Sequence, residues 1–290
     1  FDADRIKAML ADEKETRKEI ELAPGIKMTF VRVPAGQFVM GSYRGQSDTR
    51  PTAKVKIDKA FWMGELEVTN QQFNVIFPDH DSRFVDQQWK DHVVQGYPAN
   101  KPEQPVIRVS YNDAMDYCKK LSEKTGLNIT LPTEAQWEWA CRAGSDQDFW
   151  YGDMNADFGK KDNLADVTTL LLAVSGIDPQ PMPKTSYWYK YYTYLPKEEG
   201  VDDGNLVQVG GKQYEANPFG LYCMHGNVAE WTSDYLPYPY NEKSKEVSEY
   251  KVVRGGSYIE RPKFSTAYTR KGYYPYQRVF NVGFRVIIED

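Results

Sequence analysis

The chain has 290 residues and a net charge of −5, with 41% apolar and 27% charged residues. This composition is typical of a globular protein with a substantial core, and it excludes a largely disordered chain. The negative charge gives no electrostatic reason to expect nucleic acid as a partner. The longest aliphatic run, Leu170–Val174, is too short to span a bilayer, so we expect no membrane insertion.

The first 23 residues are predicted to form a charged helical leader, or a tether from upstream domains of a longer protein. Ile6, Met9 and Leu10 recur at helical spacing among charged residues. Residues 24–290 contain no repeat and no linker, and are predicted to form one domain. The opening residues are no signal peptide, so the location is unknown. The tether-like leader favours a secreted or cell-envelope location over a cytoplasmic one.

Short strands are predicted on both sides of the helical region. Met28–Val33 and Gln37–Met40 are predicted to form a β-hairpin that turns at residues 34–36, because proline and glycine favour turns. Lys54–Glu65 alternates charged and apolar residues like a strand entering the core. Lys251–Tyr258 and Gly283–Ile288 are predicted as late strands.

Three helices are predicted from their capping signals, which begin at Thr69, Ser110 and Thr133. Gly126 and Gly144 are expected to end the second and third of these helices. After Gly144 the chain is predicted to be mostly loop for about 80 residues, and loops of that length are usually functional or held by a metal.

The cysteine and histidine patterns favour no zinc site. Cys118, Cys141 and Cys223 form no CxxC pair and allow at most one disulfide. The chain's three histidines are far apart in the sequence.

Several ordered motifs resemble those of the formylglycine-generating enzyme, or sulfatase-modifying factor, family. They are Val33–Ser42, Glu67–Thr69, Pro105–Ser110, Leu131–Gly144, Gly220–Trp231, Arg254–Ser257 and Gly283–Arg285. The resemblance implies that residues 24–290 are a sulfatase-modifying-factor-like domain. It also implies an α+β fold of the C-type-lectin-like type, with little regular secondary structure and long loops.

The resemblance also argues against the activity of the family's aerobic enzymes. Those oxidoreductases bind copper(I) through two cysteines after the Gly-Gly-Ser segment and oxidise a cysteine of a sulfatase. In this chain the two positions fall on Glu260 and Ser265, and neither residue offers the thiolate that copper(I) prefers. We therefore expect no copper and a pseudoenzyme, and the sequence leaves any remaining catalysis undecided.

Two calcium sites are implied by the same resemblance. The first would use the side chains of Asn163 and Asp203 and the carbonyls of Leu164 and Asn205. An Asx-turn pair without metal is the alternative.

The second calcium site is predicted more weakly. It would use Cys223, Gly226, Val228 and Glu230, but the sulfur of Cys223 replaces an oxygen ligand. Glu230 is alternatively a structural carboxylate held by backbone amides.

The favoured function is a binding module for a peptide or glycan. Its groove floor would contain Ser257, Glu260 and Arg261, where relatives hold the reacting peptide, and the tyrosine-rich run 187–194 is a second candidate surface. Simple surface pairing of Glu260 and Arg261 is the alternative for that groove. Two other functions stay open: an oxidase with a non-standard site, and a structural subunit of a cell-envelope assembly.

Overall fold

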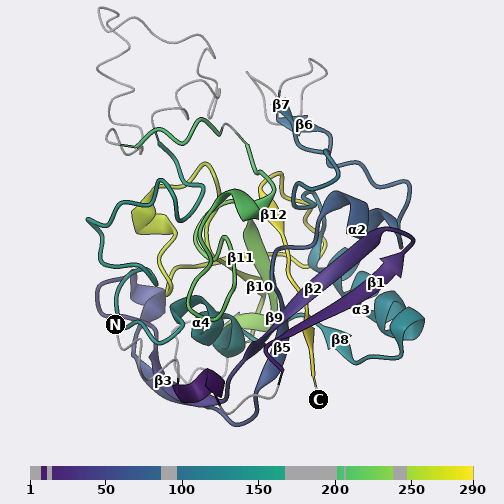
Figure 1. The fold of residues 1–290 in the computed structure, drawn as a ribbon. Coiled ribbons are helices and arrows are strands. Elements are labelled where there is room, and N and C mark those ends of the chain that lie inside the picture. The colour runs from purple at the N-terminus through teal and green to yellow at the C-terminus, as the bar shows by residue number, and fades with distance from the viewer. Residues whose placement is uncertain are drawn as a thin grey trace, which may run out of the picture.

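A computed structural model describes residues 8–11, 15–85, 97–166, 201–205, 207–237 and 247–289. Figure 1 shows an α+β arrangement in which short strands and short helices are joined by long loops. No helix among the described residues is long and apolar enough to cross a membrane. The α+β class and the long loops agree with the prediction from the sequence.

The strands form two larger sheets and two small pairs. The five-stranded sheet has the order β1 (Arg17–Ala23), β2 (Ile26–Val33), β5 (Phe61–Gly64), β13 (Ile287–Ile288) and β8 (Ile129–Thr130). The four-stranded sheet has the order β11 (Arg270–Tyr273), β10 (Val247–Arg254), β9 (Ala229–Pro237) and β12 (Val282–Gly283). The pairs are β3 (Gly36–Met40) with β4 (Ala53–Ile57), and β6 (Phe84–Val85) with β7 (Tyr97–Pro98).

The prediction of a helical leader through residue 23 is wrong for its last part. Residues 17–23 form β1, which pairs antiparallel with β2. The strand is favoured because the burial along β1 alternates, with Leu22 in the core. Residues 8–11 do form a helical turn.

The predicted hairpin of residues 28–40 is also wrong, although both of its strands exist. β2 pairs with β1 and β5, whereas β3 pairs with β4. The segment 54–65 is likewise split into β4 and β5, with a turn between them. Strand pairing depends on distant partners, which a local pattern does not reveal.

The three capping signals predicted the helices correctly. α2 (Asn70–Asn74), α3 (Tyr111–Thr125) and α4 (Glu134–Arg142) each begin with a capping box in which the Ser or Thr side chain and the third helical residue exchange hydrogen bonds. Gly126 ends α3 in the left-handed conformation. α4 ends one residue earlier than predicted, because Ala143 already adopts that conformation.

Two apolar clusters make up most of the core. One joins α2 and α3 to strands of both sheets and contains Trp231, and the other surrounds α4 and contains Trp137 and Trp139. All three tryptophans are buried. After α4, the described part of residues 145–228 has only the 3₁₀ turn Gly211–Gln213 as a helix and no named strand.

The segment after β10 approaches another part of the chain very closely. Gly255 and Gly256 both have positive φ, at 90° and 73°. A Cβ atom at Gly256 would lie 2.1 Å from the Ser265 Oγ and 3.0 Å from the Phe264 carbonyl oxygen. Only glycine therefore fits this position, and it holds residues 255–257 against residues 264–265.

A substitution of Gly256 tests this close approach. Gly256→Ala should destabilise the protein by roughly 2 kcal/mol or more, because it adds a steric clash to the conformational cost of positive φ. Gly126→Ala is the matched control, since Gly126 has φ 72° but a Cβ atom there would meet no other atom within 4 Å; it should cost only about 1 kcal/mol. Urea denaturation would measure both, and equal losses would contradict the packing argument.

Candidate functional site

The predicted ligand-binding residues lie after β10, but the structure buries part of them. Ser257 is fully buried, donates a hydrogen bond to the Glu260 carboxylate and accepts one from the Asn281 side chain at 2.8 Å. The other oxygen of Glu260 forms an ion pair with Lys271. Arg261 is half-buried beside them. Ser257 and Glu260 are thus brought together, but the buried hydroxyl of Ser257 does not offer an open groove floor.

The next turn of the same segment does line a hollow. A cavity of about 240 Å³ lies between residues 263–270 and the loop 44–49, and Met154 completes its wall. Its charged lining side chains include Arg44, Lys263 and Asp48. Lys263 is exposed, and its ammonium lies 4.7 Å from the centre of the Phe264 ring. This hollow is a better candidate ligand site than the predicted floor.

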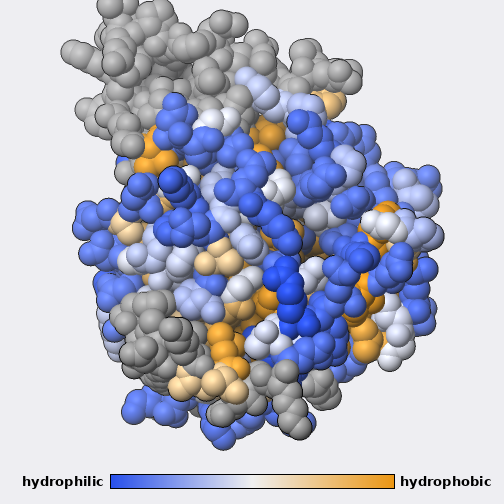
Figure 2. Space-filling view, in the orientation of Figure 1, coloured by the Kyte–Doolittle hydropathy of each residue, from blue (hydrophilic) through white to orange (hydrophobic). Residues whose placement is uncertain are grey.

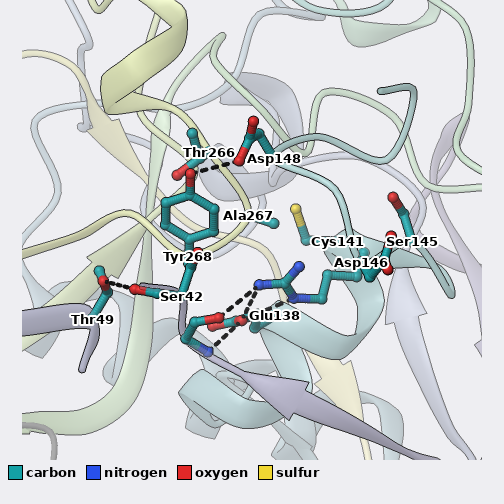
Figure 3. A network of polar contacts seen from close by, with 12 residues as sticks. Ser42, Thr49, Glu138, Cys141, Ser145, Asp146, Asp148, Thr266, Ala267 and Tyr268 are labelled. Carbon is teal, nitrogen blue, oxygen red and sulfur yellow. Dashed lines mark hydrogen bonds and ion pairs between the residues drawn. The ribbon is translucent and has the colours of Figure 1, made fainter. Parts of the chain in front are cut away.

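One wall of this hollow is fixed by a small polar network (Figure 3). Tyr268 donates its hydroxyl to the Asp148 carboxylate at 2.7 Å, and Arg44 pairs with the same carboxylate at 3.0 Å. Thr49 donates its hydroxyl to the Ser42 carbonyl at 2.7 Å, and this hydrogen bond joins the two ends of the loop 42–49. The walls of the hollow therefore do not depend on a bound ligand for their position.

Beneath the hollow, buried carboxylates of α4 bind arginines of the four-stranded sheet. Glu134 accepts hydrogen bonds from Arg254 and Arg270, and Glu138 accepts from Arg254 and Arg142. Burial alone would raise the pKa of Glu138, but Arg142 and Arg254 outweigh it and hold that pKa below its usual range. This network was not predicted from the sequence, although the spacing 134, 138 and 142 places three ionic residues on one face of a helix otherwise rich in core residues.

The backbone of Ser265 is tied to a buried histidine. The ring nitrogen Nδ1 of His225 lies 2.7 Å from the Ser265 carbonyl oxygen, and the Trp150 amide donates to Nε2 at 3.3 Å. Nδ1 therefore carries the proton and Nε2 is the acceptor. Burial lowers the pKa of His225 to about 3, so this ring stays neutral at ordinary pH.

The three cysteines are all free and buried. Burial raises the pKa of the Cys118, Cys141 and Cys223 thiols above their usual range. The Cys141 sulfur lies 3.4 Å from Nε2 of His225, which is neutral and does not stabilise a thiolate. Burial and the neutral imidazole therefore both favour the protonated form of these thiols.

The first predicted calcium site brings two loop segments together. The Asn163 side chain donates to the Val207 carbonyl at 3.0 Å, and the Asp203 amide donates to the Asp166 carboxylate at 2.7 Å. The Oδ1 atom of Asn163 is buried and has no hydrogen-bond partner among the described residues. A buried carbonyl oxygen without a donor suits a cation that prefers oxygen ligands, and Asp166 and Asp203 lie on the same two segments.

The charge state of Asp203 is consistent with an incomplete site. Burial is the largest cause that raises its pKa to about 6, and the neighbouring Asp166 adds to this effect. Hydrogen bonds from Asn205 and Tyr214 act in the opposite direction. A bound cation would remove the repulsion between the carboxylates. Leu164 is buried, as expected for a residue that would offer only its carbonyl.

The second predicted calcium site has its carboxylate engaged elsewhere. Both oxygens of Glu230 accept hydrogen bonds from Arg285, and one also accepts from the Trp137 indole at 2.7 Å. A cation would have to compete with this buried guanidinium. The Cys223 sulfur lies near the Glu67 carboxylate, and it is not an oxygen ligand of the kind that calcium prefers. Gly226 approaches Asn163, and Val228 lies in a core cluster. Glu230 is a structural carboxylate, held by side chains and not by backbone amides.

The remaining candidate surface, the tyrosine-rich run 187–194, lies outside the described residues.

Comparison with known proteins identifies the fold and the family. The model of the sulfatase-modifying factor enzyme 1-like domain matches residues 18–290. The chain is 26% identical to the formylglycine-generating enzyme of Bos taurus, over 91% of this chain and 75% of that protein. It is 27% identical to the inactive C-alpha-formylglycine-generating enzyme 2 of Bos taurus, over 92% and 90% of the two chains. The structure of PvdO from Pseudomonas aeruginosa superposes with a TM-score of 0.70 at 25% identity, covering 96% of this chain and all of that one. The chain therefore belongs to the sulfatase-modifying factor family.

Proposed function

We propose that this domain is a binding module that does not generate formylglycine and that takes a peptide in the hollow between residues 44–49 and 263–270. The observation that carries the proposal is the state of its cysteines. The family's copper positions correspond, by resemblance, to Glu260 and Ser265, and the thiols of the chain are buried and protonated. Formylglycine-generating enzyme 2, which is named inactive, is 27% identical to this chain, so a member without the activity has a precedent among its relatives.

The chemistry of the hollow favours a peptide over a glycan. Arg44, Lys263 and Asp48 give it charges of both signs, and neutral sugars gain less from such walls than peptide termini and side chains do. Its volume of about 240 Å³ suits one or two side chains of an extended segment and is below that of a drug-sized site.

A peptide and glycan array tests the ligand site. A short peptide with a carboxylate should bind the wild-type protein, and Lys263→Ala should weaken binding roughly fivefold or more, the effect of losing one partly exposed charge contact. Lys59→Ala removes an exposed lysine that lines none of the hollows described and should leave the affinity unchanged. If Glu260→Ala/Arg261→Ala abolishes binding and Lys263→Ala does not, the predicted floor is the site instead. Selective glycan binding would reject the peptide assignment.

Copper chemistry can be tested on the same protein. Incubation with copper(I), oxygen and a cysteine-containing sulfatase peptide should leave the mass of that peptide unchanged, because no thiolate pair is present. The Glu260→Cys/Ser265→Cys variant supplies two thiols at the family positions and should gain copper(I) binding in competition with a chromogenic chelator. Conversion of the peptide cysteine to an aldehyde by the wild-type chain would refute the loss of activity.

Calcium is proposed to bind at Asn163, Leu164, Asp203 and Asn205, where it would join the two loop segments. At one hundred times its Kd such a ligand stabilises the fold by about 2.7 kcal/mol, so EDTA should lower the Tm by roughly 5 °C. Asp203→Ala should abolish this EDTA effect, whereas Asp202→Ala, the exposed neighbour, should keep it. Because the pKa of Asp203 is about 6, the carboxyl is protonated below that pH, and calcium binding should weaken from pH 7 to pH 5. Identical melting curves with and without EDTA would reject the site.

A further inference from the structure

A second and larger hollow lies where the N-terminal segment meets the domain. It has a volume of about 700 Å³ and is bounded by the β3–β4 pair and the C-terminal end of α4. Phe38 and Trp139 form apolar parts of its lining, with ring centroids 5.6 Å apart, and Val39 is 52% exposed at the rim. Its size lies in the range of sites that bury a sizeable ligand.

A glycine creates a recess in this hollow. A Cβ at Gly36 would lie 2.6 Å from the Trp139 ring, so only glycine lets that ring lie against β3. The Trp139 indole donates a hydrogen bond to the Pro34 carbonyl at 2.8 Å, which fixes the ring. The methyl group of Met9 lies 3.0 Å from the same Cβ position. Met9 of the leader thus already reaches the recess.

The described part of the leader is amphipathic, and its apolar side faces the domain. Met9 and Leu10 are partly buried and pack against the core cluster of α4, whereas Ala8 and Ala11 are exposed. Figure 2 shows an apolar patch low on the front face, where Figure 1 places β3 and the helical turn of residues 8–11.

The sequence before Ala8 continues the apolar face. Ile6 precedes Met9 by three residues and Leu10 by four, so a helix would place all three on one side. One further helical turn extends about 5 Å beyond Met9, and a hollow of this size is large enough to take it. Residues 2–11 contain two acidic and two basic side chains, Asp2, Asp4, Arg5 and Lys7, so the apolar anchors rather than net charge carry the docking.

We propose that this hollow is a docking groove for the chain's own leader, in which residues 2–11 bind as an amphipathic helix and Ile6 enters the groove beside Met9. This is the helix-in-groove mode of recognition, with anchors at positions 6, 9 and 10. Arg44 lines both this groove and the 240 Å³ hollow. The docked leader therefore lies next to the wall of the candidate ligand site.

Hydrogen exchange of the full chain, followed by mass spectrometry, tests the docking. Amides of residues 6–11 should exchange more slowly than in an unstructured peptide. Ile6→Asp should accelerate their exchange roughly tenfold or more, since burial of an aliphatic side chain of this size is worth at least that factor. Ala8→Asp introduces the same residue on the exposed face and should change exchange far less. Replacing Ala8 lowers the helix propensity more than replacing Ile6 does, so the control is a stringent one.

The groove side supplies the reciprocal test. Val39→Asp should accelerate exchange in residues 6–11 as Ile6→Asp does, whereas Tyr276→Asp, an exposed aromatic position outside the groove, should not. Unprotected amides in the wild-type leader, equal effects of Ile6→Asp and Ala8→Asp, or no effect of Val39→Asp would each overturn the proposal. The last outcome, with a protected leader, would mean that the leader docks elsewhere and that the groove serves another partner.

Discussion

The arrangement of the site depends on a buried ionic network between α4 and the four-stranded sheet. Glu134 and Glu138 lie on successive turns of α4, and Arg254 and Arg270 lie on β10 and β11. Arg254 is fully buried and bridges the two carboxylates. Removal of one partner from such a network leaves a charge uncompensated in the core, at a cost of about 3–5 kcal/mol. The network therefore specifies how helix and sheet meet more strictly than apolar packing alone would.

A second buried pair follows the same rule. Arg285 binds Glu230 through two nitrogens and also donates to the carbonyls of Gly64 and Tyr222. Arg285 thereby connects β9 and β5 to the loop that contains Tyr222, which is not part of a strand. In a domain with this much irregular backbone, loop carbonyls need donors that a sheet would otherwise supply, and buried arginines provide several donors each.

The sequence predicted well what depends on neighbouring residues. Capping boxes at Thr69, Ser110 and Thr133 are local interactions, so the helices began as predicted. Strand partners are set by distant segments, and the hairpin of β2 and β3 was therefore wrong. The predicted groove shows the same division. The close approach of Gly256 to Ser265 uses the conformational freedom of a local glycine motif, whereas the buried Ser257 hydroxyl is bound by Asn281, which is distant in the sequence.

The loop after β10 also has supports that do not involve the side chains at positions 260 and 265. The loop after β10 is held by Arg254, which donates to the Ala267 carbonyl at 2.7 Å, and by the Ala267 amide, which donates to the Asp148 carbonyl. Neither contact uses the side chain of Glu260 or Ser265. The Glu260 carboxylate adds contacts of its own with Ser257 and Lys271, so a substitution at this position would remove those two contacts and leave the two contacts of Ala267 in place. Within residues 263–270, Tyr268 and Arg270 belong to the supporting networks, whereas the side chain of Lys263 is exposed. Lys263 is therefore the position at which the lining of the hollow can vary with least effect on its support.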